Sequence, residues 1–553
     1  MTLKRTFLAG LSALLISAPV LAADLDPARL TQHVRVLSDD AFEGRAPDTE
    51  GERKTVAYLV EQFKSFGLKP GGDLQTDGTR AWTQDVPLAR FDTEGPVAVS
   101  VNVAGQTRTW TQGEQVAIRA AQTGIDRLTL KDIPIVFIGY GVTAPERNWD
   151  DFKGLDMKGK IGLVLINDPD FETGQGDFGG KAMTYYGRWT YKFEEAARRG
   201  AVGFLVIHET DPASYGWATV KNSNTSTLFD IIRANPGEAH APLEGWIQRD
   251  ATVDLFKAAG LDFEALKAKA QTRDFRPVEL TGVTFSTDYA VRAQKIISKN
   301  VVARKPGRRH ADETVIYTAH WDHLGVGVGA PDARGDRIYN GAQDNALGIA
   351  SLLEVGRQYA RAPAPDRSVV FLAVTAEERG LLGSEYYAAN PLYPLATTAG
   401  VINMDGASTA GPARDFTTSG DAPLTLQDDL VALGAKRGRA YTPDPNPGAG
   451  YFFRSDHFPF AKRGVPAISF GSGQDLVEGG RARGEALARD YTTFRYHQPA
   501  DEWSPDWNLT GAAQDGGLLY DLGRELANSR RWPDWKAGSE FRAVRAATAT
   551  QRR

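Results

Sequence analysis

Short apolar runs alternate with amphipathic segments through the second half of the chain. The strand-like runs are residues 314–319, 368–375, 400–404 and 467–470. Between the first two, residues 346–361 carry apolar side chains at helical spacing, and Pro363 lies just beyond their end. Apolar strands separated by helices are typical of a sheet that is covered on both faces. The pattern therefore predicts an α/β fold, with a mixed, largely parallel sheet and helices on both faces.

The first half of the chain shows two other patterns. Residues 24–72 have helical spacing, whereas residues 82–285 contain short β-rich runs separated by Gly, Asp, Asn and Pro. A chain of 553 residues is too long for one ordinary core, so we expect two domains. The predicted organisation is one domain made of residues 23–81 and 286–530, an inserted β-rich domain at 82–285, and a solvated basic tail at 531–553.

The N-terminus has the pattern of a cleaved targeting signal. Lys4 and Arg5 precede an apolar run from Phe7 to Leu21, and small residues up to Ala22 suit a cleavage site. The run is short for a transmembrane anchor, and no later stretch is long and apolar enough to span a bilayer. We expect residues 1–22 to be a bacterial-type signal peptide. The mature protein is then expected to be periplasmic or secreted, with no membrane association after cleavage.

Composition narrows the function classes. Hydrophobic residues make up 42% of the chain and charged residues 24%, which is typical of a globular protein. The formal net charge of -5 gives no basic field that would favour nucleic acid, so we expect no nucleic-acid partner. The chain contains no cysteine, and any metal must therefore be held by His, Asp and Glu.

Five short segments in the second half each contain metal-binding side chains. The residues are His320, Asp344, the pair Glu377-Glu378, Asp405 and His497. His320, Glu377-Glu378 and Asp405 each follow closely after a predicted strand. In open α/β sheets, ligands bind beyond the carboxyl ends of the strands. Parallel strands bring these three loops to one edge, so we expect the side chains to meet in one cleft.

The set is large enough for two metal ions and a base. We assign His320, Asp344 and Asp405 to one ion, and Asp344, Glu378 and His497 to the other. Asp344 bridges in this assignment, because a carboxylate has two oxygens. The prediction is two zinc ions per chain, although cobalt or manganese fits the same kind of ligand.

Three further side chains have predicted roles around the metals. Glu377 can face the water between the ions and act as general base while its neighbour Glu378 binds metal. Asp322 lies two residues after His320 and is placed to accept the other ring N–H of that imidazole. The hydroxyl of Tyr496 can donate a hydrogen bond to the developing oxyanion.

Each of these residues taken alone has an ordinary explanation, such as a solvated acid or a turn residue. Their occurrence together at strand ends of one region favours the metal site. His323 and His457 fall near this cluster without an assigned ligand role. Ser455-Asp456-His457 contains the residue types of a nucleophilic triad, but triad members meet through space, so adjacent residues make a poor one.

The motifs resemble those of the co-catalytic di-zinc exopeptidases, a family that includes secreted bacterial aminopeptidases and, more distantly, glutamate carboxypeptidase II. The matching segments are Glu43-Gly44-Arg45, residues 298–303, 339–345, 377–384, 455–460 and 496–501. The resemblance implies the zinc exopeptidase fold, a bridging Asp344, the base Glu377 and the ligand Glu378. It also implies a cis peptide after Asp344. Residues 139–141, 158–161 and 200–203 resemble the protease-associated (PA) insert domain of such enzymes.

These observations predict a secreted zinc aminopeptidase that hydrolyses N-terminal residues from peptides. A metallo-carboxypeptidase or dipeptidase on the same scaffold is the main alternative, because arginines near the site, such as Arg454 and Arg495, leave the polarity of the substrate open. A glutaminyl cyclase needs only one zinc, and non-enzymatic relatives usually lose ligands, so the complete ligand set argues against both. The oligomeric state stays open.

Overall fold

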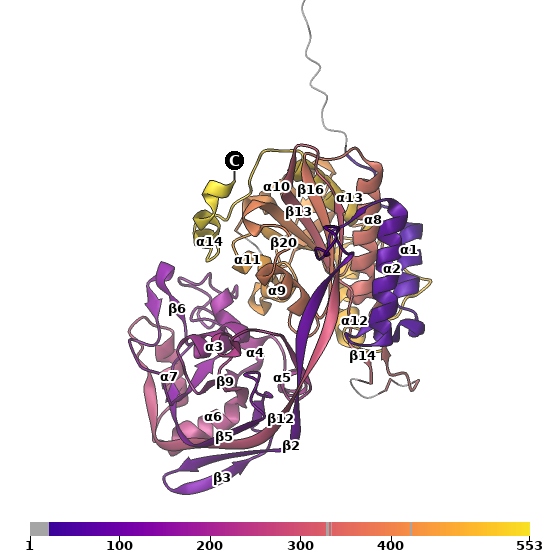
Figure 1. The fold of residues 1–553 in the computed structure, drawn as a ribbon. Coiled ribbons are helices and arrows are strands. Elements are labelled where there is room, and N and C mark those ends of the chain that lie inside the picture. The colour runs from indigo at the N-terminus through magenta and orange to yellow at the C-terminus, as the bar shows by residue number, and fades with distance from the viewer. Residues whose placement is uncertain (1–20, 328–330, 333, 421–422, 553) are drawn as a thin grey trace, which may run out of the picture.

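The computed structural model describes residues 21–327, 331–332, 334–420 and 423–552. Figure 1 shows two lobes connected by two long strands, β2 (Thr83–Val103) and β12 (Val278–Lys305). These strands pair antiparallel along most of their length, from Val103 opposite Val283 to Thr83 opposite Val301. The predicted boundaries at residues 82 and 285 fall beside β2 and inside β12. Of the predicted signal peptide, residues 1–20 lie outside the described part of the chain. None of the described helices has the length and hydropathy needed to cross a membrane.

The larger lobe is built on a mixed sheet whose centre is parallel. Its strands run in the order β19, β18, β20, β17, β13, β16, β12. The central strand β13 (His310–His320) is parallel to β16 (Arg367–Val374) and to β17 (Thr398–Met404), and β17 is parallel to β20 (Ala467–Ser472). At the edges, β12 is antiparallel to β16, and β18 (Asp415–Thr418) is antiparallel to β20. The short β19 (Ala440–Tyr441) continues parallel to β18. The predicted mixed, largely parallel α/β sheet is therefore confirmed.

Helices cover both faces of this sheet. The predicted helix at 346–361 is α8 (Leu347–Arg361), which packs on β13, β16 and β17. On the same side, Figure 1 shows α1 (Pro27–Leu37) and α2 (Glu50–Phe66), whereas α9 (Leu382–Ala389) and α11 (Phe458–Lys462) lie on the other side. Remaining helices of the lobe are α10 (Thr425–Lys436), α12 (Gly480–Phe494), α13 (Thr510–Ala527) and α14 (Arg542–Ala547).

The helical N-terminal segment divides into two helices joined by a short 3₁₀ segment, η1 (Asp40–Arg45). The Thr49 side chain caps α2 by accepting a hydrogen bond from the Glu52 N–H at 3.3 Å. Gly67 ends the helix with φ 85°, a left-handed conformation that costs glycine least. Leu59 and Phe63 of α2 are fully buried in the core of the larger lobe. Their burial holds this N-terminal segment against a sheet that is formed mainly by the second half of the chain.

The smaller lobe has its own cores and a partly parallel sheet. Strands β5 (Arg127–Phe137), β8 (Ile161–Leu165), β9 (Gly203–His208) and β11 (Leu243–Gln248) are parallel neighbours in that order. Shorter strands of the lobe are β3 (Gln106–Trp110), β4 (Val116–Ile118) and β10 (Leu228–Ile231). Its helices include α3 (Trp189–Arg198), α4 (Thr210–Ala213), α5 (Trp217–Asn224), α6 (Arg249–Ala258) and α7 (Phe263–Ala270). The short β-rich runs predicted within residues 82–285 fall in strands such as these.

The C-terminal segment differs from the prediction of a solvated basic tail at 531–553. Trp535 and Phe541 are 2% and 5% exposed and belong to the core of the larger lobe. The Arg545 side chain is buried too, and its Nη1 donates to the Thr398 carbonyl at 3.2 Å. The aromatic side chains outweigh the basic composition, because burying each of them removes a large apolar area from water.

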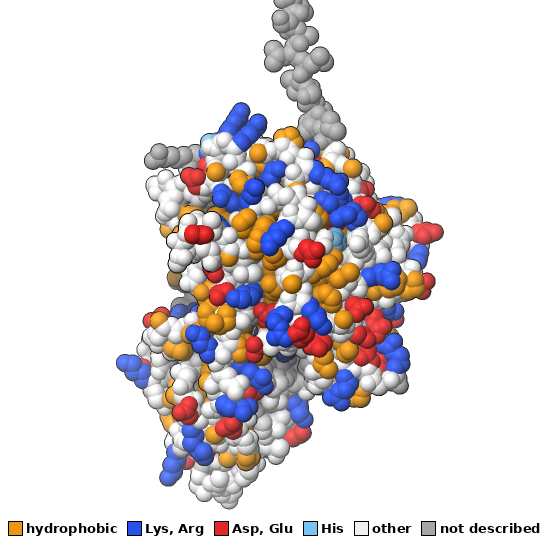
Figure 2. All heavy atoms as spheres, turned by 45° about the vertical axis from the view of Figure 1, so that its right-hand side comes forward, with side chains coloured by type: hydrophobic (Ala, Val, Ile, Leu, Met, Phe, Trp, Pro, Cys, Tyr) orange, Lys and Arg blue, Asp and Glu red, His pale blue; other side chains and the backbone are white. Residues whose placement is uncertain are grey.

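Acidic and basic side chains are intermixed on the face shown in Figure 2. This mixture agrees with the small formal net charge of -5.

Candidate metal centre

The predicted ligands come from loops at the carboxyl ends of three adjacent parallel strands. His320 is the last residue of β13, Asp405 follows β17 directly, and Glu377-Glu378 come three residues after β16. Because β13 lies between β16 and β17, the three loops meet above it. Asp344 comes from η5 (Ala342–Ala346), the turn that opens α8, and His497 follows α12. The strand-end argument thus places the side chains where the sequence suggested.

Asp344 lies between the two imidazoles. Its Oδ1 is 3.2 Å from His320 Nε2, and its Oδ2 is 3.2 Å from His497 Nε2. One more carboxylate lies close to the same Nε2 atom of each imidazole. Asp405 Oδ1 lies 3.2 Å from His320 Nε2, and Glu378 Oε2 lies 3.1 Å from His497 Nε2. Two groups of three ligands therefore share one residue.

The donor set fits two divalent cations. Four carboxylates (Asp344, Glu377, Glu378 and Asp405) converge on two imidazoles in a largely buried space. Two imidazolium charges would leave this cluster negative, and buried uncompensated charge is costly. Tetrahedral zinc with nitrogen and oxygen ligands at about 2.1 Å places neighbouring ligand atoms about 3.4 Å apart, close to the separations here. The donor atoms of His320, Asp344 and Asp405 all lie within 4.8 Å of one another.

The electrostatics of these side chains show the same crowding. Burial lowers the pKa of His320, but the carboxylates of Glu377 and Asp405 outweigh burial and raise it well above its usual value. Burial raises the pKa of Glu377 well above its usual range, and the charges of Asp405 and Glu378 add to this effect. Cations among these carboxylates would reverse the repulsion.

Asp322 supports the site, although by a contact other than the predicted one. The atom near His320 Nδ1 is the main-chain carbonyl of Asp322, at 3.1 Å, whereas its carboxylate Oδ1 is 3.8 Å away. The carboxylate instead accepts from the backbone N–H of Glu377 at 3.0 Å and of Glu378 at 3.4 Å. One buried residue thus fixes the ring of His320 and the backbone of the Glu-Glu pair.

Two buried residues that the sequence did not single out hold the backbone of the ligand loops. The Asp501 carboxylate accepts from the N–H groups of Gln343 and Asp344, both at 3.0 Å. The Arg45 guanidinium donates to four main-chain carbonyls at 2.6–2.8 Å: those of Leu37, Trp321, Asn340 and Gly341. Both residues lie in segments that resemble the di-zinc exopeptidases, namely Glu43-Gly44-Arg45 and residues 496–501. This resemblance is the signal by which sequence reasoning could have found them.

Neighbouring side chains orient individual ligands. Ser455 Oγ donates to Asp405 Oδ2 at 2.6 Å, and His323 Nδ1 lies 2.7 Å from Glu378 Oε1. His323, which had no predicted role, therefore contacts a ligand. Asp456 accepts from Ser384 Oγ at 2.6 Å. The ring nitrogens of buried His457 have no hydrogen-bond partner among the described residues, and burial lowers the pKa of this imidazole to about 3. Ser455, Asp456 and His457 thus have separate contacts and form no triad.

Tyr496 covers the outer side of the centre. Its ring stacks on the His497 ring with centroids 3.9 Å apart, and its side chain is partly exposed. Desolvation beside the ligand carboxylates raises the pKa of Tyr496 well above its usual value, and the charge of Asp344 adds to this. The implied cis peptide between Asp344 and Asn345 is present.

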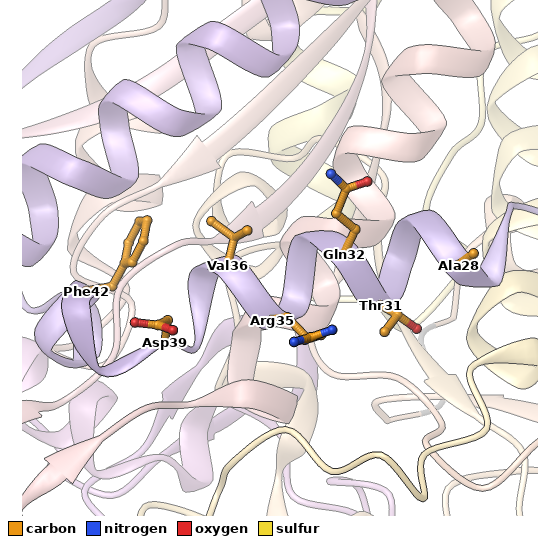
Figure 3. A pocket seen from close by; sticks show the side chains of 7 residues that line it. All are labelled: Ala28, Thr31, Gln32, Arg35, Val36, Asp39 and Phe42. Atoms are coloured by element: carbon orange, nitrogen blue, oxygen red, sulfur yellow. The ribbon is translucent and has the colours of Figure 1, made fainter.

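A pocket on the outer surface of α1 lies apart from these ligands. Figure 3 shows the side chains that line it, Ala28, Thr31, Gln32, Arg35, Val36, Asp39 and Phe42, which come from α1 and the start of η1. None of them is a predicted site residue.

Comparisons with known proteins agree with this geometry. Residues 300–519 match the model of peptidase family M28. A probable zinc metalloprotease of Pyricularia oryzae is 35% identical over 170 residues, which are 29% of this chain and 32% of that protein. Leupeptin-inactivating enzyme 1 of Streptomyces exfoliatus is 32% identical over 149 residues, 26% of this chain and 32% of the relative. The chain thus spans about a third of the length of these curated relatives.

Solved structures similar to the whole chain include an aminopeptidase from Aneurinibacillus sp. strain AM-1. It has a TM-score of 0.48 and 19% identity, with 91% of this chain and 95% of that chain covered. A zinc aminopeptidase from Bacillus subtilis has a TM-score of 0.43 and 17% identity, with 94% and 98% covered. The matched segment contains all the predicted ligands, from His320 to His497. On the family match and the ligand geometry together, residues 300–519 of this chain are similar to peptidase family M28.

Proposed function

We propose that the protein is a secreted zinc-dependent aminopeptidase that removes N-terminal residues from peptides. The observation that carries the proposal is the position of Asp344, whose two carboxylate oxygens each lie 3.2 Å from a different imidazole. A carboxylate placed in this way can join two metal ions. The names of the relatives, which include a zinc metalloprotease and a leupeptin-inactivating enzyme, point to the same chemistry.

In this proposal the two ions have three protein ligands each. His320, Asp344 and Asp405 hold one, and Asp344, Glu378 and His497 hold the other. Zinc, when bound, lowers the pKa of its water and polarises the substrate carbonyl. Asp322, His323 and Ser455 orient the ligands through the contacts described above, which reduces the rearrangement that binding requires.

Glu377 is the proposed general base. Its Oε2 lies 4.0 Å from His320 Nε2, so it faces the centre, while Glu378 contacts His497 and His323. Its backbone N–H is fixed by Asp322 at 3.0 Å. We propose that the Glu377 carboxylate takes a proton from the attacking water and delivers it to the leaving amine. Tyr496 is proposed to donate its hydroxyl hydrogen to the oxyanion.

The N-terminal sequence supports secretion or a periplasmic location, because residues 1–22 have the pattern of a cleaved signal. The peptide enters at the carboxyl ends of the strands, where the smaller lobe also contacts the larger one. Phe229 of β10 lies under the guanidinium of Arg379, at 5.6 Å from the ring centroid, one residue beyond Glu378. We propose that the smaller lobe limits the size of the substrate.

The proposal is tested with a panel of aminoacyl-p-nitroanilides and N-blocked dipeptides, with chelator and with zinc restored. We expect cleavage of the free-amine substrates alone, lost with chelator and recovered with zinc. Glu377→Gln should lower kcat by about 10²–10⁴-fold while two zinc ions stay bound. The matched control is Glu478→Gln, whose side chain is 87% exposed. Cleavage of the blocked peptides alone would indicate a carboxypeptidase, and full activity of the zinc-loaded Glu377→Gln protein would refute the assigned base.

A further inference from the structure

The base turn, residues 376–382, carries Glu377 on a strained backbone. Its ends are joined by a hydrogen bond from the Leu382 N–H to the Ala376 carbonyl at 3.0 Å. Ala376 has φ 52° and Leu381 has φ 61°, which is left-handed backbone that non-glycine residues rarely adopt. Such a conformation persists only where the surrounding structure holds it. The contacts around the base turn therefore decide where the Glu377 carboxylate lies.

Three adjacent strands bury the two ends of the base turn. Ala376 and Leu382 are 0% and 5% exposed. They share one buried apolar cluster with Leu88 of β2, Ile296 of β12 and Ile231 of β10. Ile231 lies opposite Leu88, and Leu88 lies opposite Ile296, so these three side chains form a row across the strands. Because β10 belongs to the smaller lobe, that lobe completes the surface against which the base turn packs.

Phe229 gives β10 a second contact with the base turn. Its ring lies under the guanidinium of Arg379, 5.6 Å from the ring centroid, and packs against the same apolar cluster. Phe229 and Ile231 are two positions apart in a strand, so their side chains leave the same face. Helix α9, which begins at Leu382, also contacts β10. One face of β10 therefore lies against the base turn.

The other face of β10 is fixed inside the smaller lobe. Leu228 is 7% exposed and belongs to a core of that lobe. The Asp230 carboxylate accepts a hydrogen bond from Arg233 Nε at 3.0 Å and lies 3.1 Å from His240 Nε2. His240 Nδ1 in turn lies 2.9 Å from Glu244 of β11. The strand that supports the base turn is thus anchored to the sheet of the smaller lobe.

We propose that Ile231 and Phe229 are positioning residues, through which the smaller lobe holds the Glu377 carboxylate at the metal centre. Asp322 holds the backbone N–H of Glu377 at 3.0 Å, and β10 holds the ends of the same turn. A general base must stay within hydrogen-bond reach of the water, and a displacement of about 1 Å can lower the rate about 100-fold. The inference rests on the proposed peptidase function and gives the smaller lobe a role in turnover besides limiting substrate size.

The first test compares two truncations in the smaller lobe, Ile231→Ala and the matched control Ile247→Ala. Both remove the same atoms from a buried strand position, but Ile247 is 0% exposed in a core of the smaller lobe and lies outside the cluster at the base turn. On an aminoacyl-p-nitroanilide, we expect Ile231→Ala alone to lower kcat about 10- to 100-fold, with KM and zinc affinity within about threefold of wild type. Ile231→Val should recover most of the kcat. Equal kcat values for the two alanine variants would overturn the proposal and leave the peptidase function standing.

The second test asks whether Ile231 acts through Glu377. Glu377→Gln removes the base, so adding Ile231→Ala to that protein should lower the residual kcat by less than about twofold. An equal loss in both backgrounds would show that Ile231 acts elsewhere, and the proposal would be wrong. If Ile231→Ala does not fold, Phe229→Ala takes its place with the same expected results, because Phe229 is only partly buried. A zinc-loaded wild-type protein that cleaves no free-amine substrate would refute the proposed function, and this inference with it.

Discussion

Asp501→Asn is the change that best separates the support of the centre from its ligands. The two carboxylate oxygens accept from different N–H groups, Oδ1 from Gln343 and Oδ2 from Asp344, each at 3.0 Å. The Tyr491 hydroxyl donates to the same Oδ2 at 3.2 Å. Asparagine has the same shape but only one oxygen, so its NH₂ group must face one of these donors. One of the two backbone N–H groups then loses its acceptor, which loosens the loop that carries Asp344.

The expected magnitude follows from the lost contact. A hydrogen bond to a charged group contributes about 1.5–3 kcal/mol, and about 2 kcal/mol corresponds to roughly 30-fold in an equilibrium constant. If Asp501 acts by holding Asp344 ready for metal, most of this appears as weaker zinc binding. Residues that orient metal ligands typically change affinity by about 10–100-fold, which agrees with this value.

The assay is competition for zinc with a chromophoric chelator at neutral pH, with circular dichroism to verify folding. The matched control is Asp506→Asn, five positions away on the exposed surface, for which we expect wild-type affinity. Zinc affinity of the Asp501→Asn protein within about threefold of wild type would refute the reasoning, because the two bonds would then contribute nothing to the order of Asp344. A lower unfolding temperature with unchanged affinity would refute it equally.

Three further predictions concern the two lobes separately. Arg45→Met should remove the hydrogen-bond donors of four main-chain carbonyls and so lower the thermal unfolding midpoint of the larger lobe. The control is Arg53→Met, because the Arg53 side chain is 72% exposed, and it should lower the midpoint far less. Equal effects of the two substitutions would contradict the role of Arg45. Removing metal with a chelator should lower the unfolding midpoint of the larger lobe, and adding zinc should restore this midpoint, because ions that bind only the folded chain stabilise the folded state. A midpoint that does not change with chelator would count against the metal site. In the smaller lobe, burial lowers the pKa of His240, but Glu244 and Asp230 outweigh it and raise the pKa to about 9. This folded-state pKa exceeds the unfolded value of about 6.5. Protonated His240 should therefore add up to about 3 kcal/mol to the free energy of unfolding below pH 6.5, and this stabilisation should be lost as the pH rises through 9. His240→Gln should therefore flatten the pH dependence of stability in that window, as measured by urea unfolding at several pH values, and an unchanged profile would exclude the contribution.

The sequence by itself determined the features that depend on local patterns. Continuous apolar runs predicted β13, β16, β17 and β20, and helical spacing predicted α8. Ligand positions followed as well, because His320 and Asp405 occur where parallel strands end. The tail at 531–553 is the counter-example. Its many basic residues suggested a solvated end, while the aromatic side chains of Trp535 and Phe541 drive it into the core.

Tertiary structure alone decided which residues hold the ligands in place. Arg45 reaches the carbonyl of Asn340, a separation of 295 positions, and Asp501 reaches the N–H of Asp344 across 157. Periodicity reports which face of an element is buried, but it does not report which distant loop supplies a partner for a buried polar group. Buried polar groups need hydrogen-bond partners, and only the folded chain shows where each partner lies.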